Sequence, residues 1–274
     1  MPQDHDDLSP AAGPPASAVS PPAPAAADFD QAFTAVAASP GVRRVWELSE
    51  SGLPPQVEPF SFVTVGLLRY VVQALDLSPG QTLLDLGCGR GGPGLWLARE
   101  ADVSLAGVDF SPVAVGHATH RAALFGLAGR ARFVVGDLAC TGLPDASADA
   151  AVCIDAFHFA ADPAAAAREV LRVLRPGRRL VLTNWQPKVQ DDPRLPGRKR
   201  IDWPRVLRGA GFAGVEMDAR PEWHDAYTRV HRVALDLGDP GGDASLADLQ
   251  DEARKYLPLA DLMYRVAVTA TAPG

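Results

Sequence analysis

Short apolar runs alternate with helical patterns over most of the chain. Between the runs, apolar residues recur at three- and four-residue intervals, the spacing of a helix with one buried face. Strands that alternate with helices in this way predict an α/β fold, in which a largely parallel sheet is covered by helices on both faces. The predicted strands are residues 82–86, 103–109, 132–137, 150–155, 179–185, 214–219 and 264–271. Further helices are predicted from Asp28 to a break at Pro40, and over 42–48, 60–77, 203–211, 223–237 and 245–257.

The first predicted strand leads into a loop with six glycine and proline residues, Gly87-Cys88-Gly89-Arg90-Gly91-Gly92-Pro93-Gly94, and then into a helix. Glycines permit positive φ angles and let bare backbone approach a ligand. The N-terminus of the following helix has unpaired N–H groups. The loop fits the pattern G-x-G-x-x-G, which is typical of a nucleotide-binding turn. Dinucleotide-dependent enzymes share that pattern, so the loop alone does not identify the ligand.

An acidic residue lies at or near the end of each of four predicted strands. The four are Asp85, Asp109, Asp137 and Asp155. Ligands of open parallel sheets bind outside the carboxyl ends of the strands. One carboxylate there could merely cap a helix or a turn, but four of them beside a glycine loop favour a shared ligand.

The charge balance argues against a nucleic-acid partner. The chain of 274 residues has a formal net charge of −7 and a pI of about 5.3, whereas nucleic-acid binding needs a basic face. Some basic residues do gather loosely in the sequence, and we interpret them as a solvated charged surface. They are Arg178, Arg179, Arg198, Lys199 and Arg200.

The three cysteines, Cys88, Cys140 and Cys153, lie in or beside apolar strands and lack the paired spacing of a metal site. We expect them to be buried and reduced, which favours a cytoplasmic protein. No apolar run reaches membrane-spanning length, so no membrane partner is expected. Residues 1–27 are rich in Pro and Ala and lack apolar periodicity, which predicts a disordered tail. Its acidic start lacks the apolar core of a secretory signal.

Several motifs, in order, resemble those of the class I S-adenosylmethionine-dependent methyltransferases, from about Phe60 to Ala272. The run Leu83-Leu84-Asp85-Leu86-Gly87-Cys88-Gly89-Arg90-Gly91 resembles the first motif of that family. Asp109 resembles its ribose-binding acid, and Gly136-Asp137-Leu138 its adenine-binding pair. The run at 174–182, Leu-Arg-Pro-Gly-Arg-Arg-Leu-Val-Leu, resembles the turn into the fifth strand. The resemblance implies a Rossmann-like seven-stranded sheet, mostly parallel with an antiparallel last strand, with helices on both faces and a helical lid.

The same resemblance implies how S-adenosylmethionine is held. A carboxylate such as Asp109 can accept a hydrogen bond from each ribose hydroxyl. Asp137 can accept one from the adenine amine, and Phe110 and Leu138 offer apolar faces to the ring. The glycine loop suits the methionine end, and Asp85 orients that loop. The implied cofactor-binding residues are Asp85, Gly87, Cys88, Gly89, Asp109, Phe110, Asp137, Leu138, Ile154 and Asp155.

Within the family, the layout resembles small-molecule methyltransferases of secondary metabolism. The implied parts are N-terminal lid helices (28–78), a cofactor-binding core (79–219), a helical lid insertion (220–262) and the last strand (263–272). The expected partner is a small-molecule acceptor, and the oligomeric state stays open. Aromatic residues of the lid suit a largely apolar pocket, although most are expected to pack the lid on the core. They are Trp46, Phe60, Phe62, Trp223, Tyr227 and Tyr256.

The segment after the fourth strand holds the catalytic candidate. In relatives that methylate sugars, a histidine there acts as a base on a substrate hydroxyl, and His158 occupies a similar position. Imidazole suits that task because its pKa lies near neutrality. Those relatives often place an acid after the fifth strand, where this chain has Asn184, which could hold a substrate by hydrogen bonds. Only Asp155 and Asn184 match the ligand set of metal-dependent relatives, so no metal is expected.

Three alternatives stay open. An NAD-dependent oxidoreductase would share the glycine loop, but its pyrophosphate needs the helix N-terminus, and Asp137 has no place in its pattern. A protein that binds S-adenosylmethionine for regulation or for a non-transfer reaction would keep every cofactor motif, since such motifs report binding and not turnover. His158, in turn, could be a purely structural histidine. Nucleic-acid amine methyltransferases carry prolines after the fourth strand. Residues 154–159 of this chain contain none, which argues against a nucleic-acid substrate.

Overall fold

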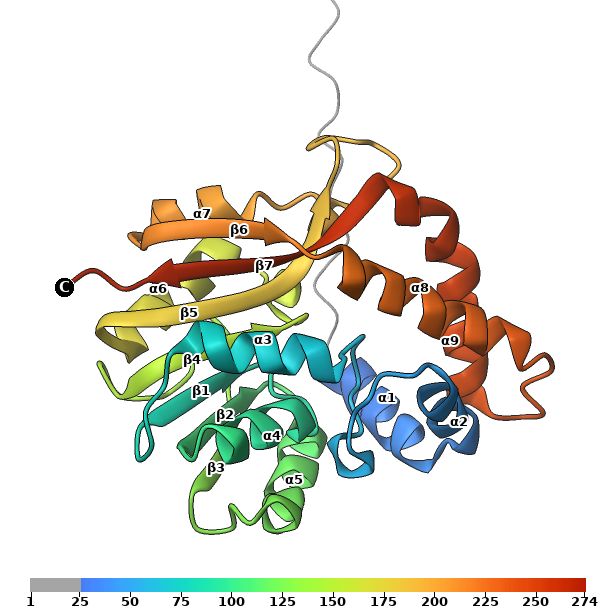
Figure 1. Cartoon of the computed structure of the whole chain (residues 1–274), viewed down its shortest axis with the longest axis horizontal. Coiled ribbons are helices and arrows are strands. Elements are labelled where there is room, and N and C mark those ends of the chain that lie inside the picture. The colour runs from blue at the N-terminus through green and yellow to red at the C-terminus, as the bar shows by residue number, and fades with distance from the viewer. Residues whose placement is uncertain (1–25) are drawn as a thin grey trace, which may run out of the picture.

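A seven-stranded sheet forms the central layer of the computed structural model, which describes residues 26–274 (Figure 1). The strand order is β3-β2-β1-β4-β5-β7-β6. Neighbours pair in parallel from β3 to β5, and β7 runs antiparallel to both β5 and β6. The predicted sheet with an antiparallel last strand is thereby confirmed. The strands are β1 (Thr82–Leu86), β2 (Ser104–Asp109), β3 (Ala131–Val135), β4 (Ala148–Ile154), β5 (Leu174–Pro187), β6 (Ala213–Ala219) and β7 (Met263–Thr271).

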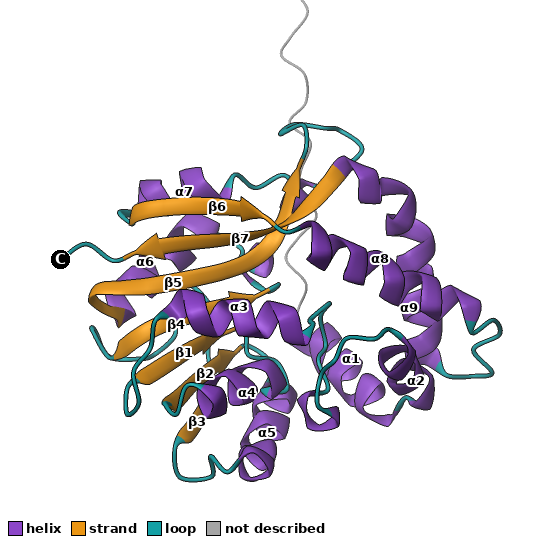
Figure 2. Ribbon diagram, viewed as in Figure 1, coloured by secondary structure: helices purple, strands orange, loops and turns teal. Residues whose placement is uncertain are grey.

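Helices cover both faces of this sheet, as Figure 2 shows. One face carries α3 (Val65–Leu75), α4 (Gly92–Glu100) and α5 (Pro112–Arg121). The other carries α6 (Pro163–Val173) and α7 (Trp203–Ala210). Side chains cap the N-termini of two of these helices: Ser111 accepts the Ala114 N–H, and Asp162 accepts the Ala164 N–H.

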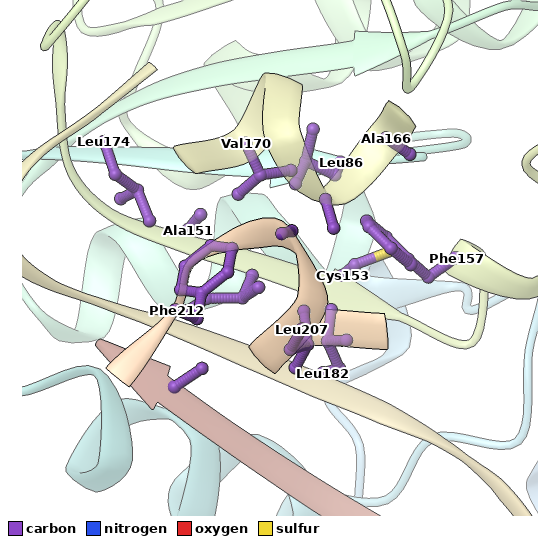
Figure 3. Close-up of a cluster of buried hydrophobic side chains, with 14 of the residues drawn as sticks. Leu86, Ala151, Cys153, Phe157, Ala166, Val170, Leu174, Leu182, Leu207 and Phe212 are labelled. Atoms are coloured by element: carbon purple, nitrogen blue, oxygen red, sulfur yellow. The ribbon is translucent and has the colours of Figure 1, made fainter. Parts of the chain in front are cut away.

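Alternating strand residues supply the two halves of the core. In β1, Leu83 packs in the cluster that contains the buried residues of α3 and α4. Leu86, which points to the opposite face of the strand, belongs to the cluster beneath α6 and α7, together with Cys153, Val170 and Leu207 (Figure 3). This division follows from the two-residue period of a strand. The sheet is therefore held rigidly from both sides, which fixes the positions of the loops at its carboxyl end.

Four further helices form a lid beyond the carboxyl ends of β1 and β4 (Figure 1). They are α1 (Ala26–Ala38), α2 (Pro40–Leu48), α8 (Pro221–Asp236) and α9 (Ala244–Tyr256). Helix α1 begins two residues before the predicted cap at Asp28. The predicted tail at 1–27 otherwise lies outside the described residues.

Asp243 joins the N-terminal and C-terminal parts of the lid. As the N-cap of α9, it accepts a hydrogen bond from the Leu246 N–H at 3.1 Å. The same carboxylate accepts from the Ser39 hydroxyl at 2.7 Å and from the Gly41 N–H at 2.9 Å, at the start of α2. One side chain thus ties together helices that are 200 residues apart in the sequence.

Two local predictions are wrong. Strand β5 begins at Leu174 and not at Arg179, because residues 175–178 bulge outward: Ala148 pairs with Leu174, but Ala150 pairs with Arg179. Cys140 is exposed, since it follows β3 in a surface loop; Cys88 and Cys153 are buried as expected. No helix in the described range, 26–274, is both long and apolar enough to cross a bilayer.

Candidate functional site

A cavity of about 380 Å³ lies between the carboxyl ends of the strands and the lid. That volume is typical of small-molecule sites. The cavity opens where the chain leaves β1 and β4 toward opposite sides, the place where open α/β sheets bind ligands. All ten predicted cofactor-binding residues line it: Asp85, Gly87, Cys88, Gly89, Asp109, Phe110, Asp137, Leu138, Ile154 and Asp155.

The glycine loop is held in place by close backbone contacts. Gly87 has a φ of 66°, and a Cβ on it would lie 2.4 Å from the Cβ of Ala156, after β4. A Cβ on Gly94, in the first turn of α4, would lie 2.2 Å from Oδ2 of Asp85. Larger residues would therefore push apart the loops that form the floor of the cavity.

Asp109 binds the loop directly. Its Oδ2 accepts the Gly89 N–H at 2.8 Å, and its Oδ1 accepts the Ser111 N–H at 2.9 Å. Burial raises the pKa of this carboxyl, while the two backbone N–H groups oppose the shift. The Ser111 hydroxyl also donates to Asp30 of α1, which connects the end of β2 to the lid. The ribose-binding candidate thus lies where glycine loop, α5 and lid meet.

Asp85 is nearly inaccessible to solvent, with 3% of its surface exposed. Burial, and then the neighbouring charge of Asp109, raise its pKa to about 7. At neutral pH it is therefore divided between the neutral and the ionised form. A positively charged ligand group beside it would favour the ionised form.

The side of the cavity near Asp137 combines one carboxylate with aromatic rings. Asp137 is exposed, and its Oδ1 accepts the Ala139 N–H at 2.7 Å. Phe110 meets the edge of Phe29 from α1, at 5.2 Å between ring centroids. Phe29 also contacts Phe159 at the same separation. Phe29 lies in the helix that the sequence predicted from Asp28, but nothing in the sequence indicated that this helix covers the site.

Asp155 sits on a strained turn, with a φ of 56°. Its Oδ1 accepts the Thr183 hydroxyl at 2.9 Å and pairs with Nη2 of Arg265 at 2.8 Å. Arg265 is fully buried and lies 4.8 Å from the centre of the Trp185 ring. Sequence reasoning missed Arg265. Its signal was a charged residue inside the apolar strand β7, which must be paired once it is buried.

His158 lines the cavity at the η3 turn (Phe157–Phe159), and 8% of its surface is exposed. Within residues 26–274, no hydrogen-bond partner contacts its Nδ1. Burial lowers its pKa well below the usual value, and the charges of Lys199, Arg198 and Arg265 lower it further. The imidazole is therefore neutral at physiological pH, and it can exchange hydrogen bonds with a ligand.

Two of the basic residues assigned to a solvated surface lie in the cavity wall instead. Arg198 and Lys199 belong to the η4 turn (Gly197–Lys199), which packs against η3. The Lys199 Nζ lies 4.9 Å from the centre of the Trp185 ring. Burial lowers its pKa to about 7. The prediction fails because the loop after β5 folds back over the sheet, which local sequence does not reveal.

Asn184 does not line the cavity. It is buried within β5, and its Oδ1 accepts the N–H of Trp185 at 2.8 Å. Because successive strand residues point to opposite faces, Trp185 takes the position on the cavity that Asn184 was expected to hold. Within 26–274, no group of three His, Cys, Asp or Glu side chains is arranged to hold a metal ion.

The chain shows clear similarity to known proteins. Residues 84–182 match the family model described as "Methyltransferase domain". Methyltransferase GfsG of Streptomyces halstedii is 31% identical over 206 residues, which cover 75% of this chain and 68% of GfsG. The 2-methyl-6-phytyl-1,4-hydroquinone methyltransferase of Synechocystis is 34% identical over 152 residues, 54% of this chain and 46% of that protein.

The overall fold also has close structural counterparts. The crystal structure of the [4+2]-cyclase SpnF superposes with a TM-score of 0.73 and 24% identity, covering 93% of this chain and 98% of SpnF. The chain spans less than half the length of the hydroquinone, sterol and phosphoethanolamine methyltransferases that it matches.

Proposed function

The chain belongs to the S-adenosylmethionine-dependent methyltransferase family, and we propose that it transfers a methyl group from S-adenosylmethionine to a small-molecule acceptor. The observation that carries this proposal is the cavity. Residues assigned to the cofactor from four separate strand ends line one space, and that space continues beneath the lid to His158. The net charge of −7 supports a small molecule over a nucleic acid as acceptor. The three free thiols fit a cytoplasmic location.

The residues present suit the cofactor chemically. Asp109 would accept hydrogen bonds from the ribose hydroxyls while its loop contacts stay in place. Asp137 would accept from the adenine amine, beside the apolar side chains of Phe110 and Leu138. Asp85, with its raised pKa, would gain from the positive charge at the methionine end. Bound S-adenosylmethionine supplies a methyl group on a sulfonium, which is a good leaving group.

On the acceptor side, the residues of this chain would act mainly by positioning the acceptor. Alignment of a nucleophile with the methyl group can supply much of the rate enhancement. His158, whose Nδ1 has no hydrogen-bond partner among residues 26–274, would hold an acceptor hydroxyl or carbonyl by a hydrogen bond. Its lowered pKa makes it a weak base, so we assign it to positioning the acceptor. Asn184 has no part in this proposal, because it does not line the cavity.

One lining residue favours this cofactor over a dinucleotide. Asp137 lines the cavity beside Phe110 and Leu138, where it suits an adenine amine, and it has no place in the dinucleotide pattern.

The first test is a calorimetric titration of the protein with S-adenosylhomocysteine and, separately, with NADH. We expect micromolar binding of S-adenosylhomocysteine alone. Binding of NADH instead would overturn the assignment of the cofactor.

A non-transfer reaction is the second candidate, because the fold is shared over nearly its full length with a [4+2]-cyclase. Cofactor binding alone does not distinguish the two. Incubation with S-adenosylmethionine and a panel of phenols, hydroxy-polyketides and amines does so, because methyl transfer releases S-adenosylhomocysteine. Consumption of an acceptor without release of S-adenosylhomocysteine would favour the second candidate.

A further inference from the structure

The end of the cavity near β5 gathers more positive than negative charge. Arg198, Lys199 and Arg265 lie there with the carboxylates of Asp155 and Glu252. The pair between Asp155 and Arg265, at 2.8 Å, accounts for one charge of each sign. Two cations, Arg198 and Lys199, then face the carboxylate of Glu252 on α9. Asp248, one turn earlier on α9, also lines the cavity but is not among the charges that shift the pKa of Lys199. With Arg198, Lys199 and Glu252 ionised, one positive charge is left unmatched among these three.

Within residues 26–274, the two remaining cations, Arg198 and Lys199, lie against aromatic rings and not against carboxylates. Among the described residues, neither Arg198 nor Lys199 forms an ion pair, and the buried Nε of Arg198 has no hydrogen-bond partner. Both side chains lie against aromatic rings instead, Arg198 at 5.7 Å from the centroid of Phe159 and Lys199 at 4.9 Å from that of Trp185. The adjacent Nδ1 of His158, in a side chain more than nine-tenths buried, also has no hydrogen-bond partner within residues 26–274. Leaving the buried Nε of Arg198 and Nδ1 of His158 unpaired costs free energy, and a ligand that bonds to them would remove that cost.

The walls around this charged end are largely apolar. Helices α8 and α9 contribute Tyr227, Leu249 and Tyr256 to the cavity, and Trp185 closes it from β5. Burial raises the pKa of Tyr227 far above its usual value, so this phenol stays neutral and adds no negative charge. A ligand that fits here therefore has an apolar body and one anionic group.

We propose that the acceptor is an apolar, ring-containing molecule with an acidic oxygen group, and that Arg198 and Lys199 bind this group as an anion. The inference rests on the proposed function, since it names the substrate class of the same site. The guanidinium of Arg198 can bind a carboxylate or an ionised enol with two parallel hydrogen bonds, and Lys199 adds a point charge. The cofactor's own carboxylate is assigned to the glycine loop at β1, so it does not occupy this end.

The test compares two probes of the same shape, 2-naphthoate and the neutral 2-naphthamide. Each is titrated by calorimetry into protein saturated with S-adenosylhomocysteine, so that the cofactor's carboxylate is already bound. We expect naphthoate to bind about tenfold more tightly than naphthamide, because charge-assisted hydrogen bonds are roughly twice as strong as neutral ones. The variants Arg198→Met and Lys199→Met keep the apolar stem, and each should remove most of that preference. Lys188→Met, at an exposed position, is the matched control and should retain it.

Further outcomes separate the proposals. Naphthoate binding should weaken as the pH rises above about 7, the pKa to which burial lowers Lys199, because the probe stays anionic while the lysine loses its proton. Any of three results would overturn the anion site. They are equal affinity for the two probes, a preference for naphthoate that survives both variants, and no naphthoate binding at millimolar concentration. If S-adenosylhomocysteine itself does not bind, the proposed function fails instead.

Discussion

Replacing Asp109 with Ala tests the centre of the proposed cofactor site. In the folded protein its carboxylate accepts the Gly89 N–H at 2.8 Å and the Ser111 N–H at 2.9 Å. With cofactor bound, it would also accept two ribose hydroxyls. Two charge-assisted bonds of about 1.5–3 kcal/mol each, less the water contacts that replace them, give about 2–4 kcal/mol. The Kd for S-adenosylhomocysteine should therefore rise on the order of 30- to 1,000-fold.

The loss of stability should be smaller than the loss of binding. Removing the acceptor leaves two loop N–H groups unpaired, but it also removes a carboxylate whose raised pKa shows that burial opposes its charge. These two effects offset each other in the unfolding free energy. Cofactor binding has no such compensation, because the ribose hydrogen bonds are simply lost. The Kd for S-adenosylhomocysteine is therefore a more sensitive measure than the free energy of unfolding.

The assay is calorimetric titration with S-adenosylhomocysteine, together with urea unfolding of the same samples. Asp236→Ala, at an exposed acid at the end of α8, is the control and should bind like the parent protein. An Asp109→Ala protein that is folded and binds with unchanged affinity would refute the assignment of Asp109 to the ribose.

Three other changes probe separate parts of the molecule. Asp85→Asn should stabilise the protein on the order of 2–4 kcal/mol at pH 8. The pKa of Asp85 is raised from 3.8 to about 7 in the folded protein, so the free energy of unfolding falls as the pH rises through that window and Asp85 ionises. Asparagine stays neutral and avoids this loss. Urea unfolding at pH 5 and pH 8 measures this, and an unchanged pH slope would contradict it. Asp243→Ala should cost about 2–3 kcal/mol, through loss of the α9 cap and its bonds to the start of α2. Burial tends to raise the pKa of Asp243, but the hydrogen bonds that this carboxylate accepts lower the pKa by more. The contribution of Asp243 to the free energy of unfolding should therefore disappear as the pH falls below about 4. Asp251→Ala on the exposed side of α9 serves as the comparison, and equal losses in both variants would argue against the lid link. His158→Ala should slow turnover about tenfold, because it removes one hydrogen bond of about 1.4 kcal/mol that positions the acceptor, while S-adenosylhomocysteine affinity stays within about twofold; if turnover is unchanged, His158 is structural.

The cofactor end could be predicted because its residues are encoded by local patterns. Asp85 and Asp109 each follow an apolar run directly, and a parallel sheet brings the ends of such runs together. The glycine loop has its own composition, and its positive φ angles explain that composition. Neither inference needed knowledge of contacts between distant segments.

The acceptor end could not be predicted in the same way. Arg198 and Lys199 reach the cavity because the loop after β5 folds back onto η3, a contact that no local pattern encodes. Asn184 was misplaced for a different reason. The predicted strand 179–185 already contained Asn184, and the alternation of side chains along β5 turns Asn184 away from the cavity and Trp185 toward it.

The lid connects the two ends of the cavity physically. Helix α1 contacts the cofactor end through Asp30, which accepts the Ser111 hydroxyl two residues beyond Asp109. Its Phe29 touches both Phe110 at the cofactor end and Phe159 at the acceptor end. The lid insertion adds Glu252 opposite Lys199. Because α1 contacts both ends, a displacement of α1 would alter the cofactor end and the acceptor end together. The helices that position the acceptor would also exclude water from the sulfonium. Water must be excluded for the methyl group to be transferred to the acceptor and not to solvent.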